Sequence, residues 1–390
     1  MRINVFPIVS SLHEKNRINY ETEVLLNELA NDGQYDIRIV DVSELYDADL
    51  ALILIQSGGS EQLFLDNYDK LKPPFYLLTY GHNNSLAASL EILSYLKDHK
   101  LAGEVLHGNT NYLIQRIQEL TKSKKCYRYG VIGKPSDWLI ASNVDYEVAH
   151  NIHNIDLIDI DINELIILYQ LIDDVDCDER FSFDKDALIS AYKLQKALNK
   201  LKDKYELDGL TIRCFDLLET IKTTACLALS IFNQEKSVST CEGDIPTMIS
   251  MHVLKEICGQ VGFQANPSRI NKTDSTMVLA HCTLPLDMSK SFSLDTHFES
   301  GIGVAIKGEL KEDKVTIFKL SRNLKDYYVT TGRIIRNLNE NNLCRTQIEI
   351  SIDDNIAYFL ERPYGNHHVV IYGDYKEKIV AYMKKICLNK

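Results

Sequence analysis

Two carboxylates stand close together in the motif Cys241-Glu242-Gly243-Asp244, where a buried strand pattern meets the start of a helix pattern. In α/β proteins, functional sites are built at the carboxyl ends of the strands. Glu242 and Asp244 are therefore candidates to bind a divalent metal or to move a proton. A plainer interpretation also fits, in which Asp244 is a helix N-cap and Glu242 is an exposed turn residue.

Histidine supplies the second group of candidates. His281 ends an apolar strand pattern, His297 lies in a polar segment, and His367-His368 opens another strand pattern. Adjacent strand residues face opposite sides, so only one of that last pair can face a given site. Each of these histidines, taken alone, also fits a core or surface position. The chain has no HExxH motif and no CxxC pair, so a metal site here would be assembled from distant segments.

Phosphate-binding loops are the other chemistry that an α/β sequence often carries. Neither GxxxxGK[ST] nor GxGxxG after a strand occurs in this chain. The segments 58–60 and 81–85 both follow strand patterns, and their turns could present backbone N–H groups to a polar ligand. An ordinary connection between a strand and a helix explains both segments more simply.

The elements that must position these residues begin with two α/β series. Strand and helix patterns alternate over residues 1–125, which predicts a mostly parallel sheet covered on both faces. A polar stretch at 121–125 marks the boundary to a second series over 126–262, which holds both carboxylates. Residues 188–205 have helical periodicity with lysines on the outer face. A further helix is expected over 244–258.

The last part of the chain, residues 263–390, changes character. Strand patterns follow one another with few helices between them, which predicts an antiparallel β unit, either a sandwich or a barrel. The strands are expected at 277–282, 303–309, 314–320, 330–335, 346–350 and 368–372. A final helix is expected from Lys376 to about Cys387.

Composition bounds the class of protein. The 390 residues are enough for two or three domains, and the share of hydrophobic residues, 45%, is usual for a globular chain. A net charge of −12 disfavours binding to nucleic acid or to an anionic membrane surface. We recognise neither a signal peptide nor a run of ~18 apolar residues that could span a membrane. Nine cysteines, an odd number, fit reduced thiols in a cytoplasmic protein.

Several blocks of the sequence resemble the L-fucose isomerase-like family, which is related to the L-fucose and L-arabinose isomerases. The clearest blocks are 212–215 (IRCF), 224–230 (TACLALS), 241–246 (CEGDIP) and 279–283 (LAHCT). The segments 133–140 (GKPSDWLI), 365–368 (GNHH) and 372–374 (YGD) fit the same pattern. The resemblance covers nearly the whole chain and is most specific from about residue 208 to residue 299, although the chain is shorter than the L-fucose isomerases.

The resemblance implies a fold and a reaction. The fold is two stacked, doubly wound α/β domains followed by a C-terminal antiparallel β-barrel-like domain. The expected assembly is a homo-oligomer, a trimer or a hexamer, with active sites shared between subunits. The reaction is aldose–ketose isomerisation of a monosaccharide with Mn²⁺ or another divalent cation. In it, a carboxylate takes a proton from the carbon beside the carbonyl, an ene-diol forms, and a proton returns to the adjacent carbon.

The resemblance also implies site residues. Asp244 matches the family's second carboxylate ligand, and Asn366-His367 matches the segment of its histidine ligand. The first carboxylate ligand lies earlier in the family's sequence; Glu219 is the nearest acid by spacing, and Glu242 is the alternative. We therefore expect Asp244, His367 and Glu219 to hold the metal, with Asp244, Glu219 and Glu242 as the catalytic carboxylates.

Further residues are expected to contact the sugar. They are Lys134, Asp137, Trp138, His281, His297, Asn366 and His368, together with His82 and Asn83, which would reach the site of a neighbouring subunit. The expected substrate is a fucose-like, deoxy or C6-modified hexose, and Lys134 or Arg213 could serve a negatively charged group on it.

Two alternatives to an isomerase stay open, because a fold does not fix a function. The first is a non-catalytic sugar-binding protein on the isomerase scaffold. The second is another metal-assisted enzyme on the same frame, for example an epimerase.

Overall fold

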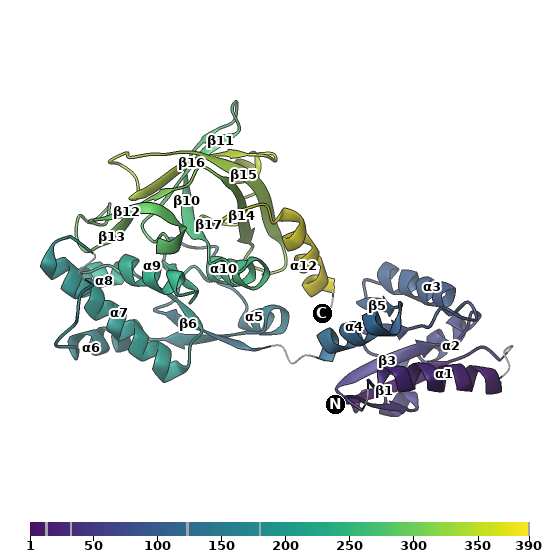
Figure 1. Ribbon diagram of the computed structural model, residues 1–390. Coiled ribbons are helices and arrows are strands. Elements are labelled where there is room, and N and C mark those ends of the chain that lie inside the picture. Colours follow the sequence, from purple (N-terminus) through teal and green to yellow (C-terminus); the bar gives the residue numbers. More distant parts are fainter. Residues whose placement is uncertain (12–14, 32, 122–124, 179–180, 389–390) are drawn as a thin grey trace. The chain divides into compact units, whose positions relative to one another are not determined.

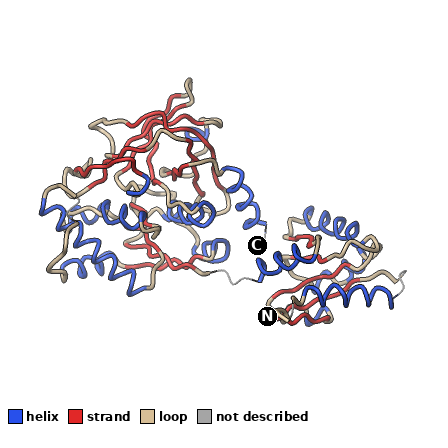
Figure 2. Tube along the Cα trace, in the orientation of Figure 1, coloured by secondary structure: helices blue, strands red, loops and turns tan. Residues whose placement is uncertain are grey.

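The computed structural model describes residues 1–11, 15–31, 33–121, 125–178 and 181–388 (Figures 1 and 2). The chain divides into two compact units, Met1–Lys124 with Lys385–Lys390, and Lys125–Lys384. The polar boundary stretch that the sequence indicates at 121–125 lies mostly outside the described residues. No helix in the described part of the chain combines the length and the apolar character that crossing a bilayer requires.

The first unit contains a five-stranded parallel sheet in the order β2-β1-β3-β4-β5. Its strands are β1 (Arg2–Ile8), β2 (Asp36–Ile39), β3 (Leu50–Ile55), β4 (Phe75–Leu78) and β5 (Gly103–Leu106). Its helices are α1 (Lys15–Leu29), α2 (Glu61–Asp66), α3 (Ser85–Asp98) and α4 (Thr110–Thr121).

Alternation along β3 explains how this first sheet is covered on both faces. Leu52 and Leu54 belong to one hydrophobic cluster, whereas Ile53 and Ile55 belong to another. Successive strand residues point to opposite faces, so a strand that is apolar throughout buries side chains in two hydrophobic cores, one on each face of the sheet. This confirms the parallel sheet that the sequence predicts for the first part of the chain.

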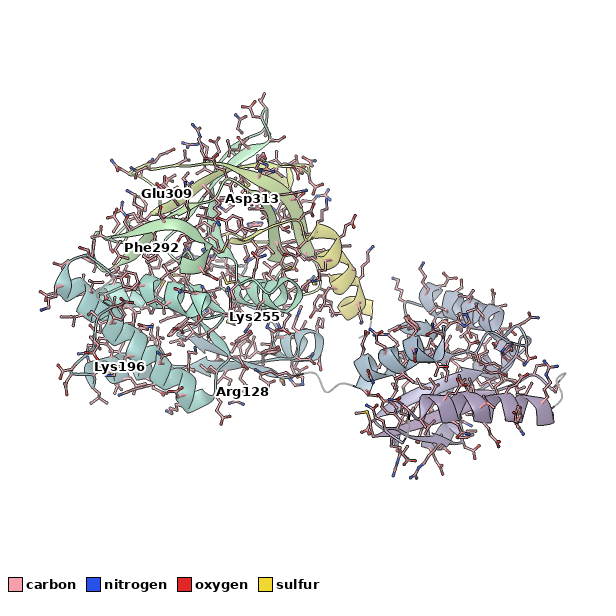
Figure 3. All side chains as sticks on the ribbon, in the orientation of Figure 1. Arg128, Lys196, Lys255, Phe292, Glu309 and Asp313 are labelled. Carbon is pink, nitrogen blue, oxygen red and sulfur yellow. The ribbon has the colours of Figure 1, made fainter. Side chains whose placement is uncertain are left out.

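The second unit contains a four-stranded parallel sheet in the order β7-β6-β8-β9. Its strands are β6 (Tyr127–Ile132), β7 (Ile155–Ile160), β8 (Gly209–Ile212) and β9 (Ser239–Cys241). The helices of this part are α5 (Tyr146–His153), α6 (Ile162–Gln170), α7 (Lys185–Tyr205), α8 (Phe215–Thr220), α9 (Cys226–Gln234) and α10 (Ile245–Cys258). Helix α7 buries Leu194 and Leu198 and exposes Lys196, as the sequence predicts (Figure 3).

Helix α10 is buried on nearly every side, because it lies between the parallel sheet and the β-rich part of the unit (Figure 1). Its ends match the sequence signals. Asp244 is the N-cap and accepts a hydrogen bond from the Thr247 backbone N–H, Pro246 lies in the first turn, and Gly259 ends the helix in a left-handed conformation. The start of this helix is therefore fixed against both neighbouring layers.

The β-rich part is a closed antiparallel barrel of six strands in the order β10-β11-β16-β15-β14-β17. The strands are β10 (Phe263–Asn271), β11 (Thr276–His281), β14 (Lys314–Leu320), β15 (Tyr327–Asn337), β16 (Thr346–Ile352) and β17 (His368–Tyr372). A separate antiparallel hairpin joins β12 (Ser289–Asp295) to β13 (Ala305–Leu310). Two helices complete the fold, α11 (Tyr358–Glu361) and α12 (Lys376–Leu388).

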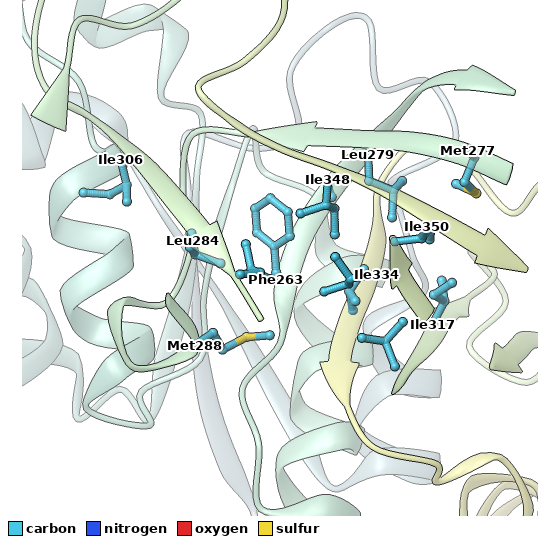
Figure 4. Close-up of a cluster of buried hydrophobic side chains, with 14 of the residues drawn as sticks. Phe263, Met277, Leu279, Leu284, Met288, Ile306, Ile317, Ile334, Ile348 and Ile350 are labelled. Atoms are coloured by element: carbon cyan, nitrogen blue, oxygen red, sulfur yellow. The ribbon is translucent and has the colours of Figure 1, made fainter. Parts of the chain in front are cut away.

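The barrel interior is a continuous apolar core (Figure 4). Phe263 lies in it together with Ile317, Ile334, Ile348 and Ile350, and all five side chains are fully buried. By contrast, Glu309 and Asp313 are exposed (Figure 3). The structure thus confirms a mixed α/β chain with parallel sheets and an antiparallel barrel, whereas the stacking of two α/β domains stays a prediction.

We expect the Phe263→Ala substitution to lower the free energy of unfolding of the second unit by about 3–5 kcal/mol, because it leaves a cavity in a closed core. Phe292→Ala is the matched control, since Phe292 lies on the hairpin and is 40% exposed. Chemical denaturation followed by circular dichroism measures both changes. Equal losses for the two variants would contradict the assignment of the core to the barrel interior.

Candidate metal centre

The motif at 241–244 forms a tight turn at the end of β9. Glu242 and Gly243 both have left-handed backbone conformations, with φ of 64° and 71°. A Cβ atom at residue 243 would lie 2.4 Å from the Lys134 carbonyl oxygen, so only glycine fits there. The Ser136 backbone N–H donates to the Glu242 carbonyl at 2.9 Å, which fixes the turn against the segment that follows β6.

Two histidines from the barrel meet Glu242 at this turn. The Nε2 atoms of His367 and His281 lie 3.3 Å and 3.9 Å from Glu242 Oε1. His281 ends β11 and His367 immediately precedes β17. Their ring centroids are 5.2 Å apart, and all three side chains are buried. Two segments of the barrel, 39 and 125 residues after Glu242, thus converge on one carboxylate oxygen.

Each imidazole is held by its other ring nitrogen. His281 Nδ1 pairs with the Thr283 hydroxyl at 2.9 Å, and His367 Nδ1 donates to Asp244 Oδ2 at 2.8 Å. These contacts set the ring orientations and leave both Nε2 atoms directed towards Glu242. Such anchoring of the second ring nitrogen is typical of histidines that bind metals.

Asp244 is the centre of a buried charged network. The Lys319 ammonium lies 3.3 Å from each of its carboxylate oxygens and also donates to the Thr247 hydroxyl at 2.6 Å. Lys319 and Asp244 are almost completely inaccessible to solvent. With the Thr247 N–H and His367 already bonded to it, the Asp244 carboxylate is surrounded by hydrogen-bond donors from three directions.

The surroundings shift the pKa values of these groups. Burial alone would raise the pKa of the Asp244 carboxyl, but the Lys319 charge and the His367 hydrogen bond hold it well below its usual range. Burial lowers the pKa of His367, yet the Glu242 charge and the hydrogen bond to Asp244 outweigh burial and raise that pKa to about 9. Burial also lowers the pKa of Lys319. These shifts favour ionised carboxylates at Asp244 and Glu242. Their cationic partners are Lys319 and His367.

Glu242, His281 and His367 form a group that could hold a metal ion, since one donor atom from each lies within 4.8 Å of the others. Bonds of ~2.0–2.2 Å from one ion place its donors roughly 3–4 Å apart, which these separations match. His367 Nε2 is buried and makes no hydrogen bond among the described residues. Its charged neighbour is Glu242 Oε1 at 3.3 Å, and a cation bound between the two atoms would replace that contact with a bond to each.

A pocket with a cavity volume of about 50 Å³ adjoins this group. Glu242 and His281 lie in its wall, which continues with Phe215, His297 and Glu299. The pocket therefore has room for a few water-sized groups beside the carboxylate and the imidazole. Glu242 and Glu299 are the carboxylates of the described lining, which contains neither lysine nor arginine.

Trp138 connects the metal-capable group to the surface. Its Nε1–H donates to Glu242 Oε2 at 2.8 Å, its ring packs edge-on against Phe215 at 4.9 Å, and 53% of the residue is exposed. Nearby, the Arg213 guanidinium donates two hydrogen bonds to the Asp137 carboxylate. Trp138 thus reaches the site directly, while Asp137 is engaged with Arg213 and Lys134 is exposed on the same segment.

The remaining predicted residues of the second unit lie in different surroundings. Glu219 is exposed on α8, and the structure does not bring it to the metal-capable group. His297 lines the pocket and pairs with the Ser300 hydroxyl at 3.1 Å. His368 is buried on the opposite side of β17 from His367, with its Nε2 at 3.0 Å from the Tyr358 hydroxyl. Asn366 is exposed.

His82 and Asn83 belong to the first unit. Asn83 donates to Glu21 Oε2 at 2.9 Å and accepts from Arg17, and the His82 ring lies 5.8 Å from that of Tyr80. These contacts stay within the unit. The expectation that both residues reach a neighbouring subunit's site stays a prediction.

Sequence reasoning missed two residues of this region. Lys319 is the clearer one, and its signal is a lone charge inside the apolar strand pattern KVTIFKL, where a buried lysine needs a buried acid. Glu299 lies in a polar segment beside His297, and nothing in the sequence distinguishes it from other surface glutamates.

The fold and the site define the class: an α/β protein with a metal-capable carboxylate–histidine group between a parallel sheet and an antiparallel barrel. No family model matches the chain. Over 185 residues it is 26% identical to the sulfoquinovose isomerases of Priestia aryabhattai and Priestia megaterium, a stretch that is 45% of this chain and 42% of each relative. Over 210 residues it is 22% identical to the sulfoquinovose isomerase of Clostridium sp. strain MSTE9, covering 50% of this chain and 46% of that protein.

These similarities relate the chain to sugar isomerases at low identity. In each alignment the chain spans less than half the length of the curated relative. The relationship agrees with the resemblance seen in the sequence, which points to the wider group that includes the fucose isomerases.

We expect His367→Gln and His281→Gln each to weaken Mn²⁺ binding. Loss of a residue that only orients a metal ligand typically costs about 10–100-fold in affinity, and loss of the ligand itself should cost more. His99→Gln is the control, because His99 is exposed in the first unit. Isothermal titration calorimetry on the folded variants measures the affinities. Unchanged Mn²⁺ affinity in both site variants would show that these imidazoles do not hold the ion.

Proposed function

We propose that the chain is a metal-dependent aldose–ketose isomerase that acts on a monosaccharide through an ene-diol intermediate. The observation that carries this proposal is the Glu242–His281–His367 group, which adjoins a pocket that Glu242 and His281 help to line. The similarity to curated sugar isomerases supports it. We also propose that the protein is cytoplasmic and homo-oligomeric, as a trimer or hexamer with shared sites.

Mn²⁺ or another divalent cation is the proposed cofactor, held by Glu242, His281 and His367. A bound divalent cation would supply positive charge for the oxygens of the sugar on which negative charge develops. The chain's own residues prepare that site. Thr283 and Asp244 orient the two imidazoles, and Lys319 balances the Asp244 charge.

Proton transfer at the sugar carbon requires a carboxylate oxygen that can face the pocket. Asp244 is excluded from the pocket lining by its bonds to Lys319, Thr247 and His367. Glu242 faces the two imidazoles with Oε1 and accepts from Trp138 with Oε2. We therefore assign the proton transfer to Glu299, the other carboxylate of the described lining, with Glu242 as the alternative that the sequence indicates.

The proposed substrate is a fucose-like, deoxy or C6-modified hexose. The named relatives are sulfoquinovose isomerases, and sulfoquinovose carries a sulfonate on C6. The described lining of this pocket contains no lysine or arginine to pair with a sulfonate, and Phe215 and Leu218 make part of it apolar. This favours an uncharged C6 substituent, such as the methyl group of a 6-deoxy sugar, at this wall of the pocket.

We expect Glu299→Gln to lower kcat by about 10²–10⁴-fold while Mn²⁺ still binds, since general acid–base groups contribute that much. Glu242→Gln should lose Mn²⁺ binding together with activity. Glu309→Gln, at an exposed position of the hairpin, is the control. Calorimetry and steady-state kinetics separate the two effects. If Glu299→Gln keeps the wild-type kcat, Glu299 does not transfer the proton, and Glu242 is the remaining candidate.

The test of the function itself is a sugar panel with Mn²⁺ in D₂O, covering 6-deoxyglucose, L-fucose and sulfoquinovose. Ketose formation with deuterium at C1 of the ketose or at C2 of the recovered aldose, seen by NMR, supports the isomerase. Deuterium at C2 with inversion and no ketose would indicate an epimerase. Sugar binding that raises Tm without any exchange would make the chain a sugar-binding protein.

A further inference from the structure

Five of the nine cysteines converge on the pocket beside the candidate metal centre. They come from separate segments: Cys214, Cys226, Cys241, Cys282 and Cys344. All five are free thiols. Buried cysteines usually pack as small hydrophobic residues that nothing can reach. Here the thiols lie in the wall of a small pocket, so a reagent as small as hydrogen peroxide that enters the pocket can reach them.

Cys214 and Cys241 form a close pair among these thiols. Their Sγ atoms lie 2.8 Å apart, inside the ~3.5–4.0 Å at which non-bonded heavy atoms ordinarily rest. A disulfide needs a separation of about 2.05 Å, so the two sulfurs are less than ~1 Å from bonding distance. Very little movement separates this dithiol from a covalent bond.

The backbone holds both cysteines in place. Cys241 ends β9 opposite Ile212 of β8, and the Cys214 N–H donates to the Ile212 carbonyl in a tight turn that returns the chain over the strand end. On the barrel side, Gln264 accepts from the Cys241 N–H at 2.9 Å. Because the pair is anchored by the sheet on one side and by the barrel on the other, its geometry is a fixed property of the second unit.

We propose that Cys214 and Cys241 are a dithiol modification site, which hydrogen peroxide converts to a disulfide. One sulfur attacks a peroxide oxygen and becomes a sulfenic acid, and the other peroxide oxygen leaves as water. The second sulfur then displaces the sulfenic oxygen, which also leaves as water, and the S–S bond forms. In total, two thiols and one hydrogen peroxide give one disulfide and two waters, with two electrons passing from sulfur to oxygen.

A disulfide at Cys241 would change the position of Glu242, because the two residues are joined by one peptide bond. Cys241 directly precedes Glu242, whose carboxylate faces His281 and His367 and accepts the Trp138 Nε1–H. Trp138 is the chain's single tryptophan, so its fluorescence reports on this one carboxylate. The inference needs no sugar turnover, and it stands or falls independently of the proposed function.

The experiment treats the full-length protein with one equivalent of hydrogen peroxide and follows thiol titration, intact mass and peptide mapping. We expect a loss of two thiols and two hydrogen atoms per chain, a mapped link between residues 214 and 241, and full recovery with dithiothreitol. Trp138 fluorescence should change with oxidation and return on reduction. No mapped disulfide, or a link from Cys282 to its contact partners Cys226 or Cys344, would overturn the proposal.

Variants separate this dithiol from the other thiols. Cys214→Ala and Cys241→Ala should each abolish the mapped disulfide and the reversible fluorescence change. Cys258→Ala should leave both intact, because Cys258 lies outside the pocket lining. Since either single variant removes the bond, one that folds, as judged by circular dichroism, is sufficient. A reversible fluorescence change that persists in a folded Cys241→Ala protein would refute the assignment.

Discussion

The buried carboxylate of Asp244 is the interaction on which the rest of the site depends. Removing a carboxylate from water is expensive unless charges and hydrogen bonds replace its hydration. Here the Thr247 N–H at the start of α10, the His367 imidazole and the Lys319 ammonium supply that replacement. One partner comes from the helix and two from the barrel, so the carboxylate can be satisfied only when helix and barrel are docked.

Docking of the barrel on the sheet therefore assembles the candidate centre. The sheet contributes Glu242 at the end of β9, and the barrel contributes His281 and His367 beside β11 and β17. Helix α10 lies between the two layers with most of its residues buried, and its N-terminus carries the charged network of the junction. Neither layer alone carries a complete set of donor atoms, and this explains why no short motif in the sequence identifies the group.

Much of the arrangement could be predicted from the sequence because it follows from local rules. Parallel sheets, the antiparallel β unit and the capped start of α10 all come from periodicity and end signals. The carboxylate at Glu242 was open to several interpretations, because spacing along the chain does not tell which way a side chain points. The same limit applies to Glu219, which has the expected spacing before Asp244 but is exposed on α8. The role of Lys319 cannot be predicted from local patterns, because it depends on a contact between β14 and Asp244, which are far apart in the chain.

The two carboxylates of the turn show why local geometry decides their roles. In a regular strand, residues 242 and 244 would face the same side and serve the same site. The left-handed conformations of Glu242 and Gly243 break that alternation, and close packing on Lys134 makes the second of them a glycine. Glu242 is thereby directed to the pocket and the Nε2 atoms, whereas Asp244 is directed to the helix N-terminus and Lys319. The backbone conformation that Gly243 permits thus separates the roles of the two carboxylates. Glu242 is placed to hold an ion, and Asp244 holds His367 in position.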